Sequence, residues 1–256
     1  MFQKQGPDRS TRHNCLVAGY LAAIAGFVNS GGFLLIGSFT SHVTGNVGRV
    51  ANDVVASEFH AAAAAVTMVI AFFLGTFAAS MTIESDAFRR APNAYGFALA
   101  SEGALLLGFT VLTRLAKADH PRARDAEALI LCAAMGMQNS LVTRLSGAVA
   151  RTTHLTGVIT DLGIEAARWF RYWRSTLSER VNVRLSIGRP SPTQPSAAKV
   201  VLLATIACTF VAGAIAGASA VGRFGHAAML IPAVAVLACS TYAFMNGRVA
   251  DRDDRP

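Results

Sequence analysis

The chain has 256 residues, of which 53% are hydrophobic and only 15% are charged. This balance excludes an ordinary water-soluble globular domain, because several uncharged runs reach the roughly 20 residues that a helix needs to cross a bilayer. The net charge of +8 would suit nucleic-acid binding, but the basic residues lie in predicted loops and chain ends. We therefore expect no nucleic-acid partner, and we assign the charge to membrane orientation and to contact with anionic lipid headgroups.

The predicted elements form two sets of four segments in the same order. Each set begins with a helix, continues with a shorter segment that carries a stripe of polar residues, and ends with two helices. In chain order the segments are 14–36, 40–56, 61–83, 91–113, 128–147, 153–170, 200–222 and 226–246. The pattern predicts an all-α polytopic membrane protein with two internal repeats of about four helical segments each.

The predicted organisation follows from these segments. Two tails enclose two membrane repeats with a basic loop between them, and the second repeat also contains a basic-aromatic segment and a proline-rich linker. The regions in chain order are 1–13, 14–113, 114–127, 128–246 with the basic-aromatic and linker part at 168–199, and 247–256. We expect both tails to be cytoplasmic.

Polar residues recur at matched places in the two repeats. The recurring residues are Asn29 and Asn139, His42 and His154, and Thr44-Gly45 and Thr156-Gly157. In an apolar chain, polar residues repeated in this way indicate a shared internal site. Small residues four apart in 72–79 and 210–217 match as well, and such spacing lets helix backbones approach closely in lipid.

The two polar-striped segments each place a histidine eleven residues before a carboxylate. His42 precedes Asp53 in this way, and His154 precedes Glu165. Read as helices, these stripes line an interior cavity. The alternative is an amphipathic helix at the membrane interface, in which Arg49 and Asp53 form a solvated pair. Both interpretations stay open for the carboxylates, whereas the His and Thr-Gly residues favour the cavity.

The number of membrane crossings depends on the striped segments. If both cross, the chain has eight crossings, and this arrangement gives the stronger excess of Lys and Arg on the cytoplasmic side. The polar residues of 40–56 favour six crossings instead. Six crossings are expected in either case. The other two, and with them the choice between a parallel and an inverted repeat, stay open.

Two further features point to the membrane interior. Gly31 and Gly32 follow Asn29 and are expected to interrupt the first helix, and broken helices expose backbone groups to solutes. Packing by small residues is the alternative for both glycines. Glu102 interrupts an otherwise apolar run. A carboxylate at such a place is a candidate proton carrier or cation partner, and the alternative is a structural pair with another polar side chain. The predicted solute or ion pathway comprises Asn29, His42, Thr44, Gly45, Asn46, Asp53, Glu102, Asn139, His154, Thr156, Gly157 and Glu165.

A cluster of aromatic and basic residues begins at residue 168. The predicted lipid-interface residues are Arg168, Trp169, Arg171, Trp173 and Arg174. Aromatic rings beside arginines at a helix end are typical of an anchor at the cytoplasmic membrane surface.

Catalytic and metal-binding patterns are absent from the sequence. The four cysteines have no CxxC spacing and no neighbouring histidine cluster, so we expect neither disulfides nor a metal site. Ser41 and His42 are adjacent, but neighbours on a helix point about 100° apart, which does not suit a nucleophile and its base. We therefore expect no enzyme activity and no cofactor.

The segment Phe39-Thr40-Ser41-His42-Val43-Thr44-Gly45-Asn46, with Gly136-Met137-Gln138-Asn139 later in the chain, resembles the YoaK-like bacterial transmembrane family. That family is defined by a domain of unknown function, and the resemblance covers nearly the whole chain. It implies a multi-pass protein of the bacterial inner (plasma) membrane and supplies no substrate. The chain departs from the family pattern at Asn29, where many members carry Asp, and at His42, where many carry a hydrophobic residue.

Together these features predict a small-solute transporter or channel with its site between the two repeats. The alternative is a non-transporting membrane scaffold or lipid-sensing protein that acts through the basic-aromatic cluster. The expected partners are the lipid bilayer with its anionic headgroups and an unknown small solute. Self-association into a homo-oligomer stays open.

Overall fold

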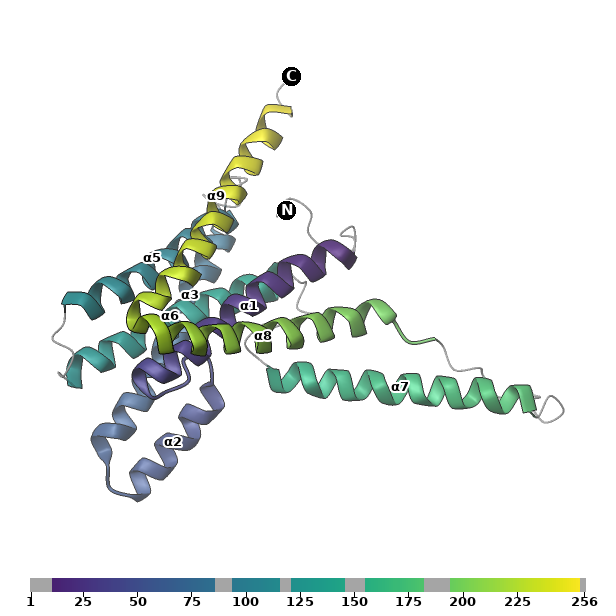
Figure 1. Ribbon diagram of the computed structural model, residues 1–256, viewed down its shortest axis with the longest axis horizontal. Coiled ribbons are helices and arrows are strands. Elements are labelled where there is room, and N and C mark those ends of the chain that lie inside the picture. The colour runs from purple at the N-terminus through teal and green to yellow at the C-terminus, as the bar shows by residue number, and fades with distance from the viewer. Residues whose placement is uncertain (1–10, 86–93, 116–120, 146–154, 182–193, 254–256) are drawn as a thin grey trace.

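The computed structural model describes residues 11–85, 94–115, 121–145, 155–181 and 194–253, and every regular element in these ranges is a helix. In chain order the elements are α1 (Thr11–Ile36), α2 (Val43–Val55), α3 (Phe59–Glu84), α5 (Ala94–Leu115), α6 (Pro121–Leu145), α7 (Leu155–Val181), α8 (Ala197–Phe224), the short 3₁₀ helix η1 (Gly225–Met229) and α9 (Leu230–Asp253) (Figure 1). A helix pairs nearly all of its own backbone polar groups, which is what an apolar chain in lipid requires.

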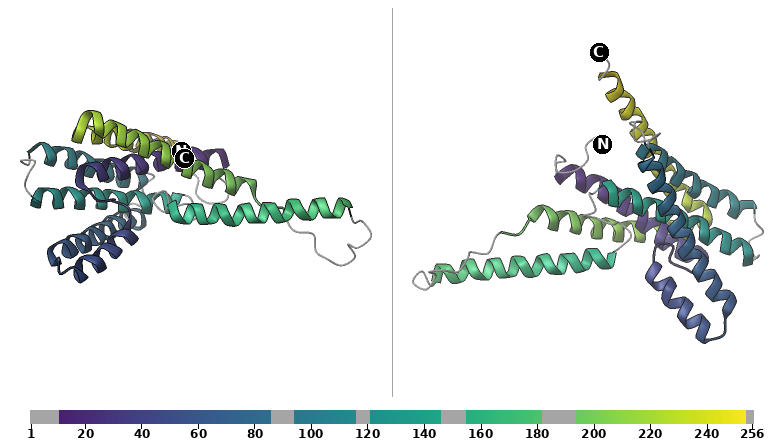
Figure 2. Two further views of the ribbon diagram at one scale, coloured as in Figure 1. Left: turned by 60° about the horizontal axis from the view of Figure 1, so that its bottom comes forward. Right: turned by 180° about the vertical axis from the view of Figure 1, so that it is seen from behind.

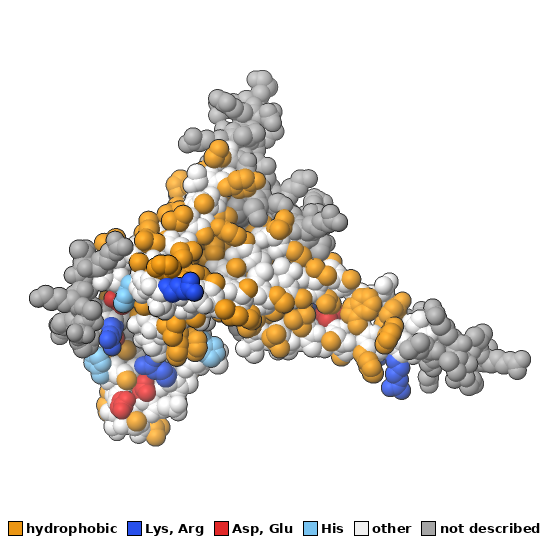
Figure 3. All heavy atoms as spheres, viewed as in Figure 1, with side chains coloured by type: hydrophobic (Ala, Val, Ile, Leu, Met, Phe, Trp, Pro, Cys, Tyr) orange, Lys and Arg blue, Asp and Glu red, His pale blue; other side chains and the backbone are white. Residues whose placement is uncertain are grey.

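Four stretches of the described residues are long and apolar enough to cross a membrane. They are Cys15–Ile36, Phe59–Glu84, Ala94–Thr113 and Ala197–Met245, the last of which contains α8, η1 and most of α9. Many large hydrophobic side chains on these helices are exposed, and hydrophobic side chains are spread widely over the described part of the face seen in Figure 3. Such a surface suits lipid and not water, so the apolar helices indicate a membrane-embedded protein.

α1 and α6 contribute many of the fully buried residues of the largest apolar core. The two helices run in opposite directions. Gln138 donates a hydrogen bond from Nε2 to the carbonyl oxygen of Leu21 at 3.0 Å. Further along both helices, Gly32 lies against the side chain of Leu131. Moving forward along α1 from Leu21 to Gly32 therefore means moving backward along α6 from Gln138 to Leu131, which is the antiparallel arrangement.

α1 crosses α8 in the same direction and at very close range. A Cβ atom at Gly26 would collide with the carbonyl oxygen of Phe210, and Gly31 lies against Val221. Gly213 makes the reciprocal contact with the backbone of α1. Only glycine allows the two backbones to touch in this way.

α3 crosses α6 in the same manner. A Cβ atom at Gly136 would collide with the carbonyl oxygen of Phe72, and Gly75 makes the reciprocal contact with the backbone of α6. Ser80 and Ser140 share a hydrogen bond of 2.9 Å further along, so these two helices are also parallel. Thus α1, the first helix of the first half of the chain, packs on α8 of the second half. In the same way α6, the first helix of the second half, packs on α3 of the first half.

α5 and α9 pair with each other in opposite directions. Gly103 lies against the side chain of Leu237, and the Ser240 hydroxyl donates to the Gly96 carbonyl oxygen at 2.8 Å. This pair completes the bundle beside the two close crossings.

α2 and α7, the two polar-striped segments, extend outward from the bundle, each in a hairpin with the helix that follows it. After α2 the chain makes a tight turn, in which Ser57 has a φ of +63°, and α3 returns along α2. α7 lies along α8 (Figures 1 and 2). Charged side chains gather over the α2–α3 hairpin (Figure 3). α2 has only 13 residues, which makes it about 20 Å long, and this is less than the roughly 30 Å thickness of a bilayer core.

Two elements differ from the sequence-based expectations. α1 is continuous through Asn29, Gly31 and Gly32, so the expected interruption is not there. Both glycines instead face close neighbours, and the chain reverses only after Gly37, which has a φ of +75°. α7 also continues to Val181, which is eleven residues beyond the end of the expected 153–170 segment.

Candidate functional site

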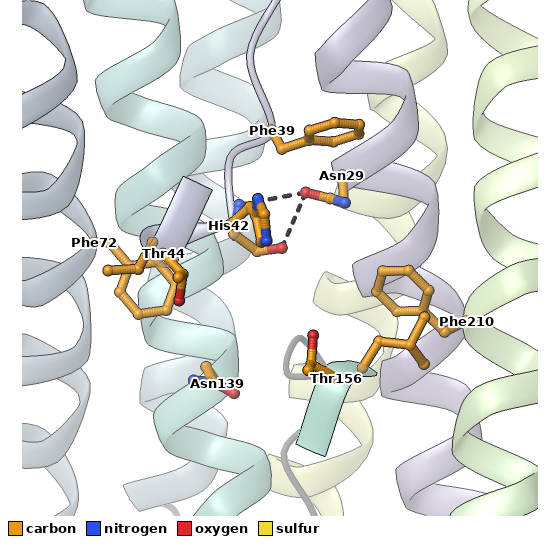
Figure 4. A pocket seen from close by; sticks show the side chains of 11 residues that line it. Asn29, Phe39, His42, Thr44, Phe72, Asn139, Thr156 and Phe210 are labelled. Atoms are coloured by element: carbon orange, nitrogen blue, oxygen red, sulfur yellow. Dashed lines mark hydrogen bonds between the residues drawn. The ribbon is translucent and has the colours of Figure 1, made fainter. Parts of the chain in front are cut away.

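A cavity of about 480 Å³ lies where α1, α3, α6 and α8 meet the amino-terminal ends of α2 and α7 (Figure 4). Its walls come from both halves of the chain in matched pairs. Asn29 and Asn139 face it from α1 and α6, and Phe72 and Phe210 face it from α3 and α8. Both phenylalanines lie at the midpoint of their helices. The cavity is therefore at half the length of two membrane-spanning helices.

The amino-terminal turns of α2 and α7 supply a third and a fourth matched pair. Val43 and Thr44 line the cavity from the start of α2, and Leu155 and Thr156 line it from the start of α7. Phe39, Ser41 and His42, from the segment that leads into α2, complete the lining. The corresponding histidine, His154, lies outside the described residues.

Asn29 holds the chain before α2 against α1. Its Oδ1 atom accepts hydrogen bonds from the backbone N–H of Ser41, at 3.3 Å, and from the Ser41 hydroxyl, at 2.9 Å (Figure 4). Asn29 lies about two turns before the end of α1 at Ile36. The reversal at Gly37 thus brings the chain back into the bundle, and α2 begins at depth and not at the end of α1.

His42 occupies the N-cap position of α2 but makes no capping hydrogen bond with its side chain. Its ring lies over Gly45, where a Cβ atom would collide with the imidazole, and makes an edge-to-face contact with Phe39 at 6.3 Å between centroids. This contact explains the glycine of the first Thr-Gly pair.

The first turn of α2 keeps unused hydrogen-bond donors. The N–H of Asn46 is bonded to the carbonyl oxygen of His42 at 3.0 Å. The N–H groups of Val43, Thr44 and Gly45 come before it and have no acceptor among the described residues. The start of α2 therefore directs free donors and a partial positive charge toward the cavity.

Asn139 belongs to the opposite wall. Its Oδ1 atom is buried and has no hydrogen-bond partner in the described part of the chain. An atom buried in this way is not exposed to the cavity either, so Asn139 lines the wall with the rest of its side chain. None of the 11 lining residues is Asp, Glu, Lys or Arg. The site thus combines polar groups with aromatic walls.

The polar stripe of α2 divides into two parts. His42 and Thr44 line the cavity, and Asn46 is buried at the base of the helix. Arg49 and Asp53 lie further along and pair with each other at 3.7 Å, while Arg49 also donates to Ser38 Oγ at 2.7 Å. The structure therefore pairs Asp53 with Arg49 along α2 and away from the cavity lining, with Asp53 only partly exposed.

The other two predicted carboxylates also lie away from the cavity lining. Glu102 is fully buried in α5, and neither of its oxygens has a partner among the described residues. Glu165 is buried in α7, where its Oε1 accepts from Lys199 of α8 at 3.0 Å and from Arg168 at 2.8 Å. The hydrogen bond from Lys199 and the charges of both cations hold the pKa of Glu165 below its ordinary value.

The basic-aromatic cluster occupies the outer half of α7. Trp173 and Phe170 are more than 60% exposed, and Arg168, Arg171 and Arg174 are exposed as well. Trp169 is half-buried and lies edge to face with Tyr172, with ring centroids 6.1 Å apart. Gly157, the remaining predicted residue, lies in the first turn of α7.

Sequence reasoning missed the aromatic and aliphatic part of the lining. Phe72 and Phe210 stand at the start of the matched 72–79 and 210–217 segments, so the repeat itself carried the signal that could have identified them. Val43 and Leu155 directly precede the two Thr-Gly pairs and could have been found in the same way. Among the described residues, no group of three or more His, Cys, Asp or Glu is placed to hold a metal ion.

The profile of a family described as "Protein of unknown function (DUF1275)" matches residues 17–243. No curated protein and no solved structure matches the chain.

Proposed function

The chain belongs to the DUF1275 family of proteins of unknown function, and we propose that it is an integral membrane protein that moves a small solute through the cavity between its two halves. The observation that carries this proposal is the pairing of residues in the cavity. Asn29 with Asn139, Thr44 with Thr156, and Phe72 with Phe210 reach one space from opposite halves of the chain. Solute sites at the interface of two repeats, near mid-membrane, are characteristic of transporters.

The directions of the helices support an inverted repeat. α1 and α6 would be the first helices of the two repeats, and they run antiparallel. Equivalent helices are antiparallel only if each repeat crosses the membrane an odd number of times. Three crossings per repeat, made by α1, α3 and α5 and by α6, α8 and α9, meet this condition. The proposal therefore adopts six crossings.

The length of α2 supports the same arrangement. α2 is too short to cross, and its amino-terminal end is at the cavity. The first 13 residues of α7 end at Ala167, and the next residue, Arg168, begins the basic-aromatic cluster. In this arrangement α2 and the first 13 residues of α7 both start at the cavity, and the two helices leave toward opposite faces. α7 then continues into the interface, where arginines and tryptophans are favoured.

The charges fit an inward orientation of the tails. In this arrangement the amino-terminal tail, the 86–93 segment, the 168–199 region and the carboxyl-terminal tail share one side, and they contain most of the Lys and Arg. Basic residues concentrate on the cytoplasmic side. Together with the YoaK-like resemblance, this supports a bacterial inner membrane protein with both ends in the cytoplasm.

Flux measurement in proteoliposomes tests the proposal. The purified protein would be assayed with a panel of radiolabelled organic acids, amino acids, sugars and ions. We expect flux of at least one class, and we expect Asn139→Ala to reduce it because Asn139 lines the cavity. Asn52→Ala is the matched control, since Asn52 is exposed on α2 and does not line the cavity. Absence of flux for the whole panel would contradict a transport function.

A second candidate function rests on the surface of α7. Trp169 and Trp173 are four residues apart and share one side of the helix, whereas Arg171 and Arg174 share another. This is the pattern of a helix that places rings among acyl chains and guanidinium groups at phosphates. A lipid-sensing scaffold would lose its lipid dependence on Trp173→Ala with Arg171→Ala and would tolerate Asn139→Ala. A transporter would instead lose activity with Asn139→Ala and tolerate Trp173→Ala with Arg171→Ala.

A further inference from the structure

The wall of the cavity determines which solutes it favours, and this step rests on the proposed transport function. From the wall we infer that the solute is a small organic monocarboxylate with an apolar body, bound with its carboxylate at the half-helix amino-terminal ends. Three properties of the lining support this inference: the sign of its electrostatic field, its hydrogen-bond donors and its apolar area.

The field in the cavity has one sign. The start of α2 presents the free N–H groups of Val43, Thr44 and Gly45, and the start of α7 enters the same space at Leu155 and Thr156. Helix amino-terminal ends carry a partial positive charge and are suited to anions. Both ends face one cavity, so their fields add. No acidic side chain lines the cavity to neutralise this field or to hold a cation.

The polar side chains of the lining can supply further donors. Thr44 and Thr156 have hydroxyl groups, His42 has a ring N–H, and the Asn29 amide has a free NH₂ group because only its oxygen is engaged by Ser41. The Asn139 amide lines the cavity as well and carries an NH₂ group that can donate. A carboxylate has about four acceptor positions and matches this set of donors.

The apolar lining excludes a small inorganic anion as the best occupant. Phe39, Phe72 and Phe210 form much of the wall, together with Val43 and Leu155. A hydrated inorganic anion would leave this surface in contact with water, whereas an organic body would bury it. The cavity of about 480 Å³ lies within the range of roughly 300–1,000 Å³ that is usual for organic ligands.

Three isosteric probes separate the charge classes. Benzoate, benzamide and benzamidine have the same planar shape and carry negative, zero and positive charge near neutral pH. Binding to the full-length protein in nanodiscs would be measured by ligand-induced thermal stabilisation and by calorimetry. We expect benzoate to bind about tenfold or more tighter than either of the other two.

A charge reversal in the wall makes the test specific. Asn139→Asp adds a carboxylate of nearly the same shape, so we expect it to abolish benzoate binding and to create benzamidine binding. Asn52→Asp adds the same charge on the exposed face of α2 and should leave the benzoate preference intact. A change confined to overall stability would lower all three signals together and would not exchange the preference.

The outcomes distinguish this inference from the proposed function. Equal binding of benzamide, preferred binding of benzamidine, or no binding of any probe would overturn the assignment of a monocarboxylate. In each of these cases, flux of another solute in the proteoliposome panel would leave the transport function standing. Absence of flux together with benzoate binding would overturn transport and keep the anion site.

Discussion

Gly26 of α1 lies directly against the carbonyl oxygen of Phe210 of α8, with no space for a Cβ atom between them. Gly136 of α6 has the same relationship to Phe72 of α3. Phe72 and Phe210 also line the cavity with their side chains. The two closest helix crossings therefore fix the position of the aromatic walls, and packing and site geometry depend on the same glycines.

Gly26→Ala should destabilise the protein by about 1–3 kcal/mol, because the added methyl group would push against backbone that cannot move aside without separating the helices. Gly136→Ala should have a similar effect for the same reason. Thermal unfolding in detergent, followed by size-exclusion chromatography, would measure both. Gly108→Ala in α5 is the control, since nothing lies within 4 Å of its position. A Gly26→Ala protein as stable as the Gly108→Ala protein would contradict the close crossing.

The all-helical fold class and the apolar helices were predictable from the sequence alone. An uncharged run of more than about 20 residues has few structural alternatives, because an unpaired backbone group in lipid is too costly. The close contacts at Gly75 and Gly213 could also be anticipated, since small residues four apart share one helix face. The recurrence of the Asn and Thr-Gly residues indicated which positions to compare.

The pairing of helices could not be predicted in the same way. Lipid is as apolar as a neighbouring helix, so hydropathy does not reveal that α1 meets α8 and α3 meets α6. The stripe of α2 also left open whether Asp53 would lie beside His42 at the cavity or pair with Arg49. That separation depends on the depth at which α2 begins, and the hydrogen bonds from Ser41 to Asn29 fix this depth.

Accessibility from outside the cell should distinguish six crossings from eight. In a background without the four native cysteines, Ser57→Cys and Arg124→Cys should react with a membrane-impermeant maleimide in intact spheroplasts. Both positions are exposed, and six crossings place both outside. Arg171→Cys, in the basic-aromatic cluster, should react only after lysis. Protection of Ser57→Cys and Arg124→Cys in intact spheroplasts would favour eight crossings and would remove the inverted repeat.

Glu102→Gln should leave the unfolding temperature unchanged or raise it. Both oxygens of Glu102 are buried without a partner among the described residues, so the substitution breaks no hydrogen bond and removes a group that is costly to bury as an ion. Ser240→Ala, at the same α5–α9 interface, is the comparison. It removes the hydrogen bond to Gly96 and should cost about 1 kcal/mol. If Glu102→Gln is the more damaging change, the carboxyl group has a structural partner.

Lys199 should be the residue that holds α7 to α8. Its Nζ donates to the buried Glu165 across the two helices, whereas Arg168 pairs with Glu165 from the same helix and is 61% exposed. Lys199→Ala should therefore widen the distance between spin labels at Ile164→Cys and Val201→Cys, and Arg168→Ala should leave it nearly unchanged. Equal widening by both substitutions would show that the local pair matters as much as the interhelical one.

The same contact should make the α7–α8 hairpin sensitive to acid. Lys199 and Arg168 lower the pKa of Glu165, so the folded state binds its proton more weakly than the unfolded state does. The stabilising contribution is therefore complete above the ordinary pKa of a glutamate and is lost as the pH falls through the lowered value. The spin-label distance should stay constant at neutral and mildly acidic pH and should increase only in stronger acid. Glu165→Gln should remove this dependence, because an amide has no proton to gain in that range, and a transition that persists in Glu165→Gln would assign it to another group.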